Sequence, residues 1–211
     1  MTRAIEDNKK VLVEKLYIKN TFSMNDIAKH LGVSLDATVS FFRRHDIKRR
    51  TQKEAQYEKF QKKQASFTKN KLNTNYLKEL AVIGAMLYWG EGYKGNDRLP
   101  AKGIDFTNSD YKMILLFLKF LRSVFVIDEK KIRIYLYCYS NQDIPKIIQF
   151  WSKITKVPTN RFTKPYVRND FNDKGNKMLH GLVHIRYNDK KLLLEVKSMI
   201  ESCLHKYASV G

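Results

Sequence analysis

Apolar residues in the first quarter of the chain recur at helical spacing in three short runs. In the first run, Val11, Leu12, Leu16 and Tyr17 are spaced as on one face of a helix. The pattern between residues 8 and 50 predicts three short helices.

Turn and cap residues set the expected limits of the second and third helices. Ser23 and Asp26 have the spacing of a capping box, so the second helix is expected to start there. Gly32 is expected to stop it, and Ser34 to cap the third helix, in which Val39 is expected to be buried. The pattern predicts two helices joined by a tight glycine turn.

Residues 26–47, DIAKHLGVSLDATVSFFRRHDI, resemble the helix-turn-helix of many bacterial regulators and resolvases. Ala28 stands where two such helices cross closely, and Gly32 stands in the turn. In that motif the second helix lies in the major groove of DNA. The resemblance implies DNA contacts from the start and the outer face of this helix, at Ser34, Leu35, Asp36, Ala37, Ser40, Arg43 and Arg44. A plain three-helix bundle is the alternative.

A strongly basic segment follows the third helix. Residues 43–71 contain eleven basic and three acidic residues and few apolar ones. Such a segment is either an arm that follows DNA phosphates or a solvated linker helix. Because the run IKRRTQ comes directly after the third helix, we favour the arm and expect DNA contacts at Lys48, Arg49 and Arg50.

From residue 76 onward, helical and strand-like patterns alternate. Helical patterns cover 76–90, 110–125, 143–154 and 190–204, and strand patterns cover 102–107, 131–139, 161–168 and 178–187. The last two strands are expected to form a hairpin with its turn at 172–175. We therefore predict an α+β protein with a helix-turn-helix module at 1–50, a basic helical linker at 51–75 and an α+β domain at 76–211.

Two sequence echoes indicate an internal duplication in this domain. DYKMILL from residue 110 resembles DKKLLLE from residue 189, and LYWGE from residue 87 resembles QFWSK from residue 149. We interpret these as two αββα halves with an additional strand near residue 135. The alternative is that amphipathic helices following strands simply look alike.

The charge balance of the whole chain indicates an acidic partner. Its 211 residues include 40 Lys and Arg against 21 Asp and Glu, a net charge of +19. Such a surface gains affinity for nucleic acid by releasing condensed counterions. The two cysteines, Cys138 and Cys203, give neither a disulfide framework nor a cysteine zinc site. Because the longest apolar run, 81–89, is too short to span a bilayer, we expect no membrane partner and a cytoplasmic protein.

The run AVIGAMLYWGEG at 81–92 carries the strongest chemical signal. Ala81, Gly84 and Ala85 lie about one turn apart and would let another helix approach closely. Glu91 lies between two glycines, where the helix is expected to end. A crowded carboxylate needs a compensating donor or cation, and Mg²⁺ is the natural oxygen-binding candidate. An ordinary helix-terminal residue between turn glycines is the alternative.

GAMLYWGEG at 84–92 resembles the motif of the LAGLIDADG homing endonucleases, with Trp89 in place of the motif's first aspartate. NSD at 108–110, FWS at 150–152 and FTKP at 162–165 resemble stretches of small proteins that join a helix-turn-helix to a LAGLIDADG-like domain. The resemblance implies a saddle-shaped antiparallel sheet and paired motif helices, whose last acid binds metal beside the scissile phosphate. It implies Glu91 as metal ligand and catalytic acid, Lys164 as a further catalytic candidate, and Mg²⁺ as cofactor.

The motif helix can pair in two ways. If the second half of the chain supplies the partner helix, Lys153 takes the position of Glu91 and one acid remains. If two chains pair through the helices at 76–92, a homodimer restores both acids and a two-metal hydrolysis becomes feasible. The sequence leaves both pairings open.

Alternation along 131–139 places basic and aromatic side chains on one strand face. These are Lys131, Arg133, Tyr135, Tyr137 and Tyr139. Residues on later strands would extend the surface, namely Lys164, Tyr166, Arg168, His180, His184 and Arg186. Such a face suits duplex DNA, and its aromatic rings would also suit single strands. An ordinary solvated sheet face is the alternative. A zinc site is not expected, because four strand residues separate the two histidines by more than about 12 Å.

Together these patterns predict a sequence-specific double-stranded DNA-binding protein. It would be either a Mg²⁺-dependent homing endonuclease or a transcription regulator that keeps the fold without cutting. An RNA-binding protein is the competing interpretation.

Overall fold

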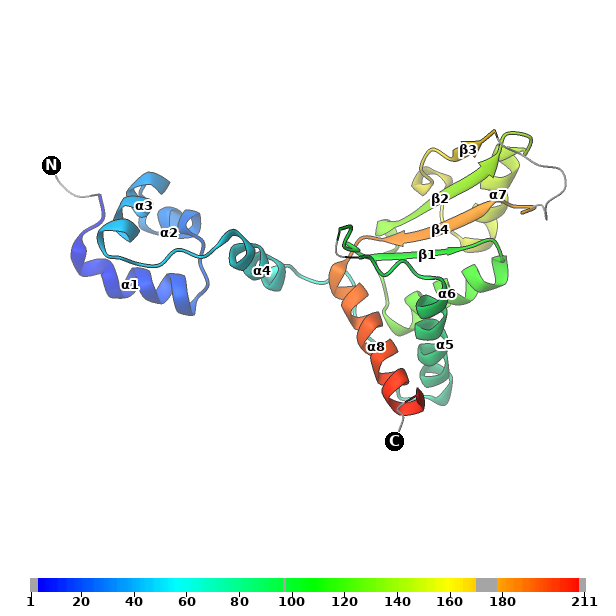
Figure 1. The fold of residues 1–211 in the computed structure, drawn as a ribbon, viewed down its shortest axis with the longest axis horizontal. Coiled ribbons are helices and arrows are strands. Elements are labelled where there is room, and N and C mark those ends of the chain that lie inside the picture. The colour runs from blue at the N-terminus through cyan, green and yellow to red at the C-terminus, as the bar shows by residue number, and fades with distance from the viewer. Residues whose placement is uncertain (1–3, 97, 170–177, 209–211) are drawn as a thin grey trace. The chain divides into compact units, whose positions relative to one another are not determined.

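A computed structural model describes residues 4–96, 98–169 and 178–208. The chain divides into two compact units, Met1–Gln64 and Ala65–Gly211, and each is considered by itself (Figure 1). None of the helices within these described ranges combines the length and the apolarity that crossing a bilayer requires.

The N-terminal unit is helical. Helix α1 (Lys10–Glu14) continues into a π-helical turn at Lys15–Lys19, and α2 (Met24–Leu31), α3 (Leu35–Arg44) and α4 (Gln52–Lys62) follow. The buried core consists of Ile5, Val13, Leu16, Tyr17, Ile27, Phe41, Phe42 and Ile47. Helix α4 buries no side chain. The three-helix core is thus built from α1 to α3, as the sequence predicts.

The predicted limits of α2 are confirmed. The Ser23 hydroxyl accepts the Asp26 N–H at 3.1 Å, and the Asp26 carboxylate accepts the Ser23 N–H at 2.9 Å. Gly32 ends the helix with φ of +67°, a left-handed conformation that glycine adopts without steric strain.

The expectation for the buried face of α3 is wrong by one position. Thr38 is fully buried, whereas Val39 is half-buried. Thr38, Phe41 and Phe42 are spaced three and four residues apart, so they share the helix face that meets the core, and Val39 points to its edge.

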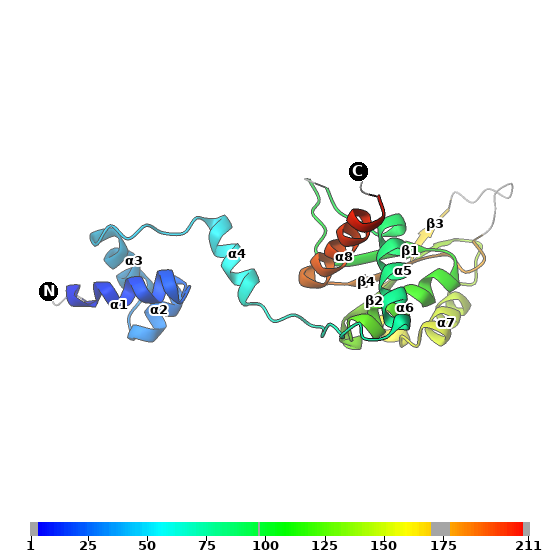
Figure 2. The same ribbon diagram turned by 90° about the horizontal axis from the view of Figure 1, so that it is seen from below.

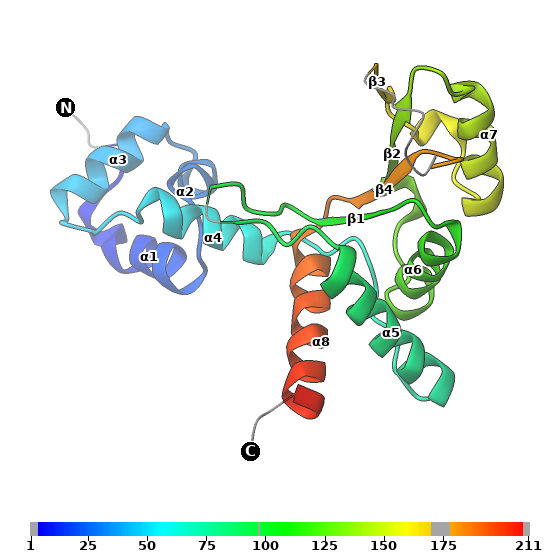
Figure 3. The same cartoon turned by 45° about the vertical axis from the view of Figure 1, so that its right-hand side comes forward.

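The C-terminal unit is α+β, as predicted. Its elements are α5 (Asn75–Glu91), β1 (Ile104–Asn108), α6 (Tyr111–Val124), β2 (Ile132–Tyr139), α7 (Ile144–Thr155), β3 (Tyr166–Arg168), β4 (Leu182–Tyr187) and α8 (Lys190–Ala208). The four strands form one sheet in the order β1-β4-β2-β3. Helices α5 to α8 pack against one of its faces, as Figures 2 and 3 show from two sides. No helix of the described residues covers the opposite face.

Two expectations for the sheet are wrong. Strand β3 pairs in parallel with β2, Tyr166 opposite Tyr137, so β3 and β4 form no hairpin and the sheet is mixed. Strand β4 instead lies between β1 and β2, antiparallel to both. It buries Val183, Ile185 and Tyr187, which suits a central position, whereas the short β3 is exposed throughout and suits an edge. The predicted turn at 172–175 lies outside the described residues.

The element order bears on the predicted duplication. Among the elements of the described residues, helix–strand–strand–helix occurs once, as α7-β3-β4-α8. Between α5 and α6 there is β1, together with a single bridge from Gly92 to Phe106. Strand β2 is the additional strand expected near residue 135. The duplication stays a prediction.

The small-residue face of α5 packs inside the chain. A Cβ atom at Gly84 would lie 2.0 Å from the ring of Phe120 on α6. Ala81 and Ala85 are buried beside it, and α8 also packs against α5. The close helix approach that the sequence predicts is therefore made with α6 of the same chain.

The segment directly after Gln64 is part of the C-terminal unit. The Thr68 N–H donates to the Phe125 carbonyl at 3.0 Å, and the Asn70 N–H donates to the Val124 carbonyl at 2.9 Å. The compact unit begins at Ala65, so the last part of the predicted linker 51–75 is fixed to the α+β unit.

Candidate nucleic-acid interface

The sheet face without helices carries polar and aromatic side chains. In β2, Ile132, Ile134 and Leu136 are buried, while the residues between them point to the other side. The strand register aligns outward residues of neighbouring strands, such as Tyr135 with His184. We define the open sheet face as Asp105, Thr107, Arg133, Tyr135, Tyr137, Tyr139, Tyr166, Arg168, His184 and Arg186.

A polar network crosses three strands of the open sheet face. Asp105 Oδ2 accepts from Arg186 Nε at 2.7 Å, and Asp105 Oδ1 lies 2.9 Å from His184 Nδ1. Thr107 Oγ1 is also 2.9 Å from that nitrogen. The guanidinium of Arg186 lies 4.0 Å above the ring of Tyr135. The acid, the cation and the aromatic ring therefore come from three different strands, β1, β4 and β2.

The charge on Asp105 is set by this network. Burial raises the pKa of Asp105, but the hydrogen bond and charge of His184 and the charge of Arg186 together hold it below its ordinary value. The carboxylate is consequently ionised at neutral pH. It offsets part of the positive charge of a face that is otherwise cationic, aromatic or neutral.

Aromatic rings extend the open sheet face toward β3. The ring of Tyr137 lies 4.8 Å from His184 and 5.3 Å from Tyr166, measured between centroids. Tyr166 is 59% exposed. Tyr137, Tyr166 and Arg168 help to line a shallow hollow of about 480 Å³. Exposed rings beside a cation form a surface on which nucleic-acid bases and phosphates are commonly bound.

Of two predicted contact residues near the start of β2, one lies outside the strand and the other lies on it as predicted. Lys131 lies in the 3₁₀ turn Glu129–Lys131 just before β2, not on the strand. Arg133 is exposed on the strand, and its Nη1 donates to the carbonyls of Lys130 and Ile132 at 2.7 and 2.8 Å. These bonds fix the direction of the Arg133 side chain.

Helix α3 presents a second polar surface, in the N-terminal unit. Asp36, Ser40 and Arg43 are exposed and are spaced along one helix face, and Leu35 is 44% exposed beside them. Ser34 caps the helix by accepting the Ala37 N–H at 3.1 Å, so its hydroxyl has a structural role. Ala37 is half-buried.

Two of the predicted DNA-contacting arginines are held by the protein. Arg44 donates to Asp7 Oδ1 and to the Ile5 carbonyl, each at 3.0 Å. Arg50 donates from its guanidinium to the carbonyls of Tyr17 and Phe22, and its backbone N–H donates to the Tyr17 hydroxyl at 2.7 Å. These bonds attach the segment after α3 to the core, and leave Lys48 and Arg49 as its exposed cations.

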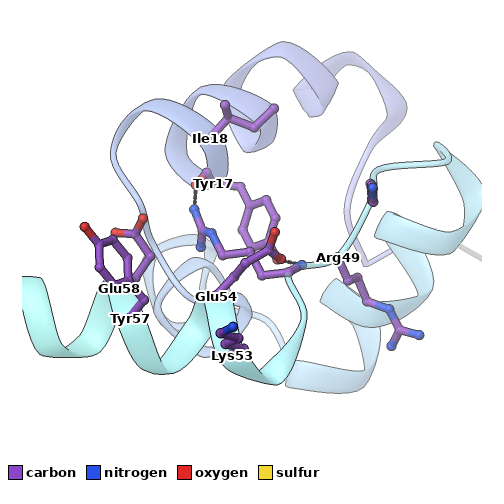
Figure 4. Close-up of a pocket in the computed structure, with 9 residues that line it drawn as sticks. Tyr17, Ile18, Arg49, Lys53, Glu54, Tyr57 and Glu58 are labelled. Carbon is purple, nitrogen blue, oxygen red and sulfur yellow. Dashed lines mark hydrogen bonds between the residues drawn. The ribbon is translucent and has the colours of Figure 1, made fainter.

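An open hollow of about 570 Å³ lies between α4 and the π-helical turn (Figure 4). Lys48 and Lys53 line it, but so do Glu54 and Glu58. Figure 4 shows Arg49 directed away from Tyr17. Arg49 and Arg50 also line it, so four basic residues stand against two acids and the lining carries a net positive charge.

Glu91 and Lys164 do not share a site within one chain. Glu91 ends α5 and is exposed, and its neighbour Gly92 bridges to Phe106 at one edge of the sheet. The same row of pairs continues through Ile185 and Ile134 to Phe162, two residues before Lys164. Four strand spacings of about 4.8 Å separate the ends of this row, or about 19 Å. One phosphate cannot contact both ends.

Glu91, the acid that the sequence predicts as a Mg²⁺ ligand, is an exposed carboxylate at the end of α5. Within the described part of the chain, no three His, Cys, Asp or Glu side chains are grouped so that they could hold a metal ion. Mg²⁺ takes octahedral oxygen coordination and uses one or two carboxylates together with substrate phosphates. Glu91 supplies one carboxylate, so the further oxygen ligands of a Mg²⁺ ion would have to come from substrate phosphates or a second copy of the chain.

No family model, curated protein or solved structure matches this chain.

The outer face of α5 is apolar and exposed. Val82, Ile83 and Trp89 are 38%, 42% and 49% exposed. Gly90 lies next to Trp89, and a Cβ atom there would contact nothing within 4 Å. Since the small-residue face is covered by α6, a homodimer through this helix would have to use this outer face.

Sequence reasoning missed Asp105 and Thr107. Both alternate with the buried Ile104 and Phe106 in GIDFTN, a period-two pattern that places them on the outward face. That pattern was available in the sequence, but their partners on β4 depend on strand pairing. Neither the sequence around Arg186 nor that around Asp105 shows that the two residues lie opposite one another.

Proposed function

We propose that this protein binds double-stranded DNA in a sequence-specific manner through two surfaces, the outer face of α3 and the open sheet face. The observation that carries the proposal is the open sheet face itself, where Arg186 is bonded to Asp105 of the neighbouring strand and lies over the ring of Tyr135, and where the rings of Tyr137 and Tyr166 contact each other across strands. The net charge of +19 supplies the long-range attraction.

The shape of each surface favours DNA over RNA. An exposed helix such as α3, or a β-ribbon, fits the wide major groove of B-form DNA, where every base pair presents a distinct pattern. The deep, narrow major groove of A-form RNA admits neither. In this proposal α2 and α3 form the helix-turn-helix, and Asp36, Ser40 and Arg43 face the groove.

Selection from a randomised duplex library tests this function directly. The full chain is expected to enrich a defined motif, and the selected duplex is expected to compete better than double-stranded RNA or single strands of the same sequence. Stronger binding of RNA would support the RNA-binding alternative, and recovery without any enriched motif would contradict sequence-specific recognition.

The enzymatic form of this proposal is metal-dependent cleavage of a DNA strand, with Glu91 as the acid that binds the metal. The position of Glu91 at the exposed end of α5 is what supports it. If it holds, Mg²⁺ leads to nicking of the selected duplex, and Glu91→Gln removes nicking while binding is retained. Glu79→Gln is a matched control, because Glu79 is an exposed acid on the same helix. Intact duplex after incubation of the wild type with Mg²⁺ would favour the regulator.

Homodimerisation through the outer face of α5 belongs to the same proposal. A second copy would cover Val82, Ile83 and Trp89, which are exposed in the single chain. Trp89→Glu is expected to convert a dimer to a monomer in analytical ultracentrifugation. A wild type that sediments as a monomer at high concentration would contradict this pairing. That the protein binds DNA in the cytoplasm is a further part of the proposal.

A further inference from the structure

Asp105 and Arg186 are directly opposite one another on β1 and β4. The Arg186 Nε donates to Asp105 Oδ2 at 2.7 Å, and the centre of the guanidinium lies 4.0 Å from the centroid of the Tyr135 ring on β2. A guanidinium that is bonded at one edge and stacked on a ring has lost most of its rotational freedom before any partner arrives.

The bond to Asp105 leaves the outer part of the guanidinium available. It uses Nε, and the side chain of Tyr135 is a further hydrogen-bond partner of Arg186. A guanidinium carries five N–H groups, so donors on its Nη atoms remain beyond these two bonds. The side chain of Arg186 is 31% exposed, and a hollow of about 270 Å³ opens beside it, lined in part by Tyr93 and Leu99. A polar group from outside can therefore reach this fork.

The presence of Asp105 on this face needs an explanation. An ionised carboxylate repels phosphates, so it lowers affinity for any DNA regardless of sequence. Asp105 is also fixed by His184, whose Nδ1 lies 2.9 Å from Oδ1, so it cannot turn away from the face. An acid with this effect is useful where it improves discrimination between sequences.

We infer that Asp105 positions Arg186 to read a guanine in the major groove of DNA. Guanine presents O6 and N7 side by side, and an arginine fork donates to both at once. Asp105 is a positioning residue, Arg186 makes the base contact and Tyr135 supports the guanidinium plane. The inference rests on the proposed DNA binding and adds the base that this part of the sheet recognises.

The experiment compares wild type, Asp105→Asn and Arg186→Ala by selection from a randomised duplex library, followed by binding of individual duplexes. The wild type is expected to require guanine at one position of its motif. Arg186→Ala loses that requirement, with a change in discrimination of about 5- to 150-fold, the range for a bidentate guanine contact. Asp105→Asn binds unselected duplex at least as tightly as wild type, but discriminates less.

In Asp105→Asn, affinity for unselected duplex is expected to be kept or to rise while discrimination falls. This combination distinguishes a positioning role from a purely structural one. A structural defect at Asp105 would weaken binding to all duplexes by a similar factor, and that result would overturn the inference. Arg133→Ala is the matched control, since Arg133 lies opposite Arg186 on β2 and is bonded to backbone carbonyls rather than to an acid. It is expected to weaken binding without changing the preferred base.

A probe on the DNA side needs no protein variant. Replacing the required guanine by 7-deazaguanine removes the N7 acceptor, and is expected to weaken wild-type binding while leaving Arg186→Ala unaffected. Equal effects on both proteins would overturn the inference. If the wild type enriches a motif whose bases are insensitive to Arg186, the inference fails and the proposed function stands. If it enriches no duplex, the proposed function itself fails.

Discussion

Ser66 and Asp189 are joined by two hydrogen bonds across 123 positions of the chain. The backbone N–H and the hydroxyl of Ser66 donate to the same oxygen, Oδ2 of Asp189, at 2.8 and 2.7 Å. The other oxygen, Oδ1, accepts the N–H groups of Lys191 and Leu192 at the start of α8. One buried carboxylate therefore both caps the last helix and anchors the segment that enters the C-terminal unit.

Asp189→Asn is expected to lower the free energy of unfolding of the C-terminal unit by about 1–3 kcal/mol, because an amide has a single acceptor oxygen and leaves buried N–H groups unpaired. Urea unfolding at pH 7 measures the loss. Asp143→Asn is the matched control, since Asp143 caps α7 at an exposed position and asparagine caps equally well. Equal losses in the two variants would contradict the anchoring role of Asp189.

The contribution of Asp189 depends on pH with a defined sign. Burial raises the pKa of Asp189, but the hydrogen bonds from Ser66, Lys191 and Leu192 hold it below its ordinary value. A depressed pKa gives stability that is complete above the unfolded-state pKa of about 3.9 and is lost as pH falls through the folded-state pKa. The difference between wild type and Asp189→Asn is expected to shrink in urea titrations below about pH 4.

Gly84 and Gly90 differ in how much space surrounds them on the same helix. Gly84→Ala places a methyl group against the Phe120 ring and is expected to destabilise the C-terminal unit by about 1–3 kcal/mol. Gly90→Ala meets nothing and is expected to stabilise α5 by up to about 1 kcal/mol. Thermal unfolding of both variants measures the difference. A destabilising Gly90→Ala would indicate that this side of α5 is covered by another chain.

Arg43 and Arg44 are adjacent but are expected to act differently. Arg43 is exposed on α3, so Arg43→Ala is expected to weaken DNA binding across sequences, and to reduce the slope of log K against log salt by about 1. Arg44 is bonded to Asp7 and Ile5, so Arg44→Ala is expected to lower the stability of the N-terminal unit by about 1 kcal/mol. Fluorescence anisotropy with a labelled duplex, together with urea unfolding, separates the two effects. A stability loss in Arg43→Ala would contradict this division.

Local signals in the sequence predicted local structure well. The Ser23 and Asp26 capping box, the end of α5 at Glu91 and the alternation of β2 were all confirmed, because each depends on residues a few positions apart. The partner of each strand was not predictable in the same way. Alternation fixes which side chains share a face, but it does not say which strand lies beside which.

The candidate site shows the same limit. The sequence indicated that Arg44, Arg50 and Arg186 are cations near potential DNA contacts, but it could not show what holds them. Their partners, Asp7, Tyr17 and Asp105, lie far away in the sequence. Spacing within a motif cannot encode such contacts, which depend on how the helices and strands pack.

Binding to duplex DNA is expected to weaken steeply with salt and to need no metal. Five exposed cations would give a slope of about −4.5 in log K against log salt if each contacts a phosphate, namely Arg43 on α3, Lys48 and Arg49 in the segment after α3, and Arg133 and Arg168 on the open sheet face. Titrations in NaCl by fluorescence anisotropy measure this slope. Because the contacts come from side-chain cations, EDTA is expected to leave the binding constant unchanged at constant ionic strength. A flat salt dependence would contradict phosphate binding, and loss of affinity in EDTA would indicate that a metal ion bridges the protein and the DNA.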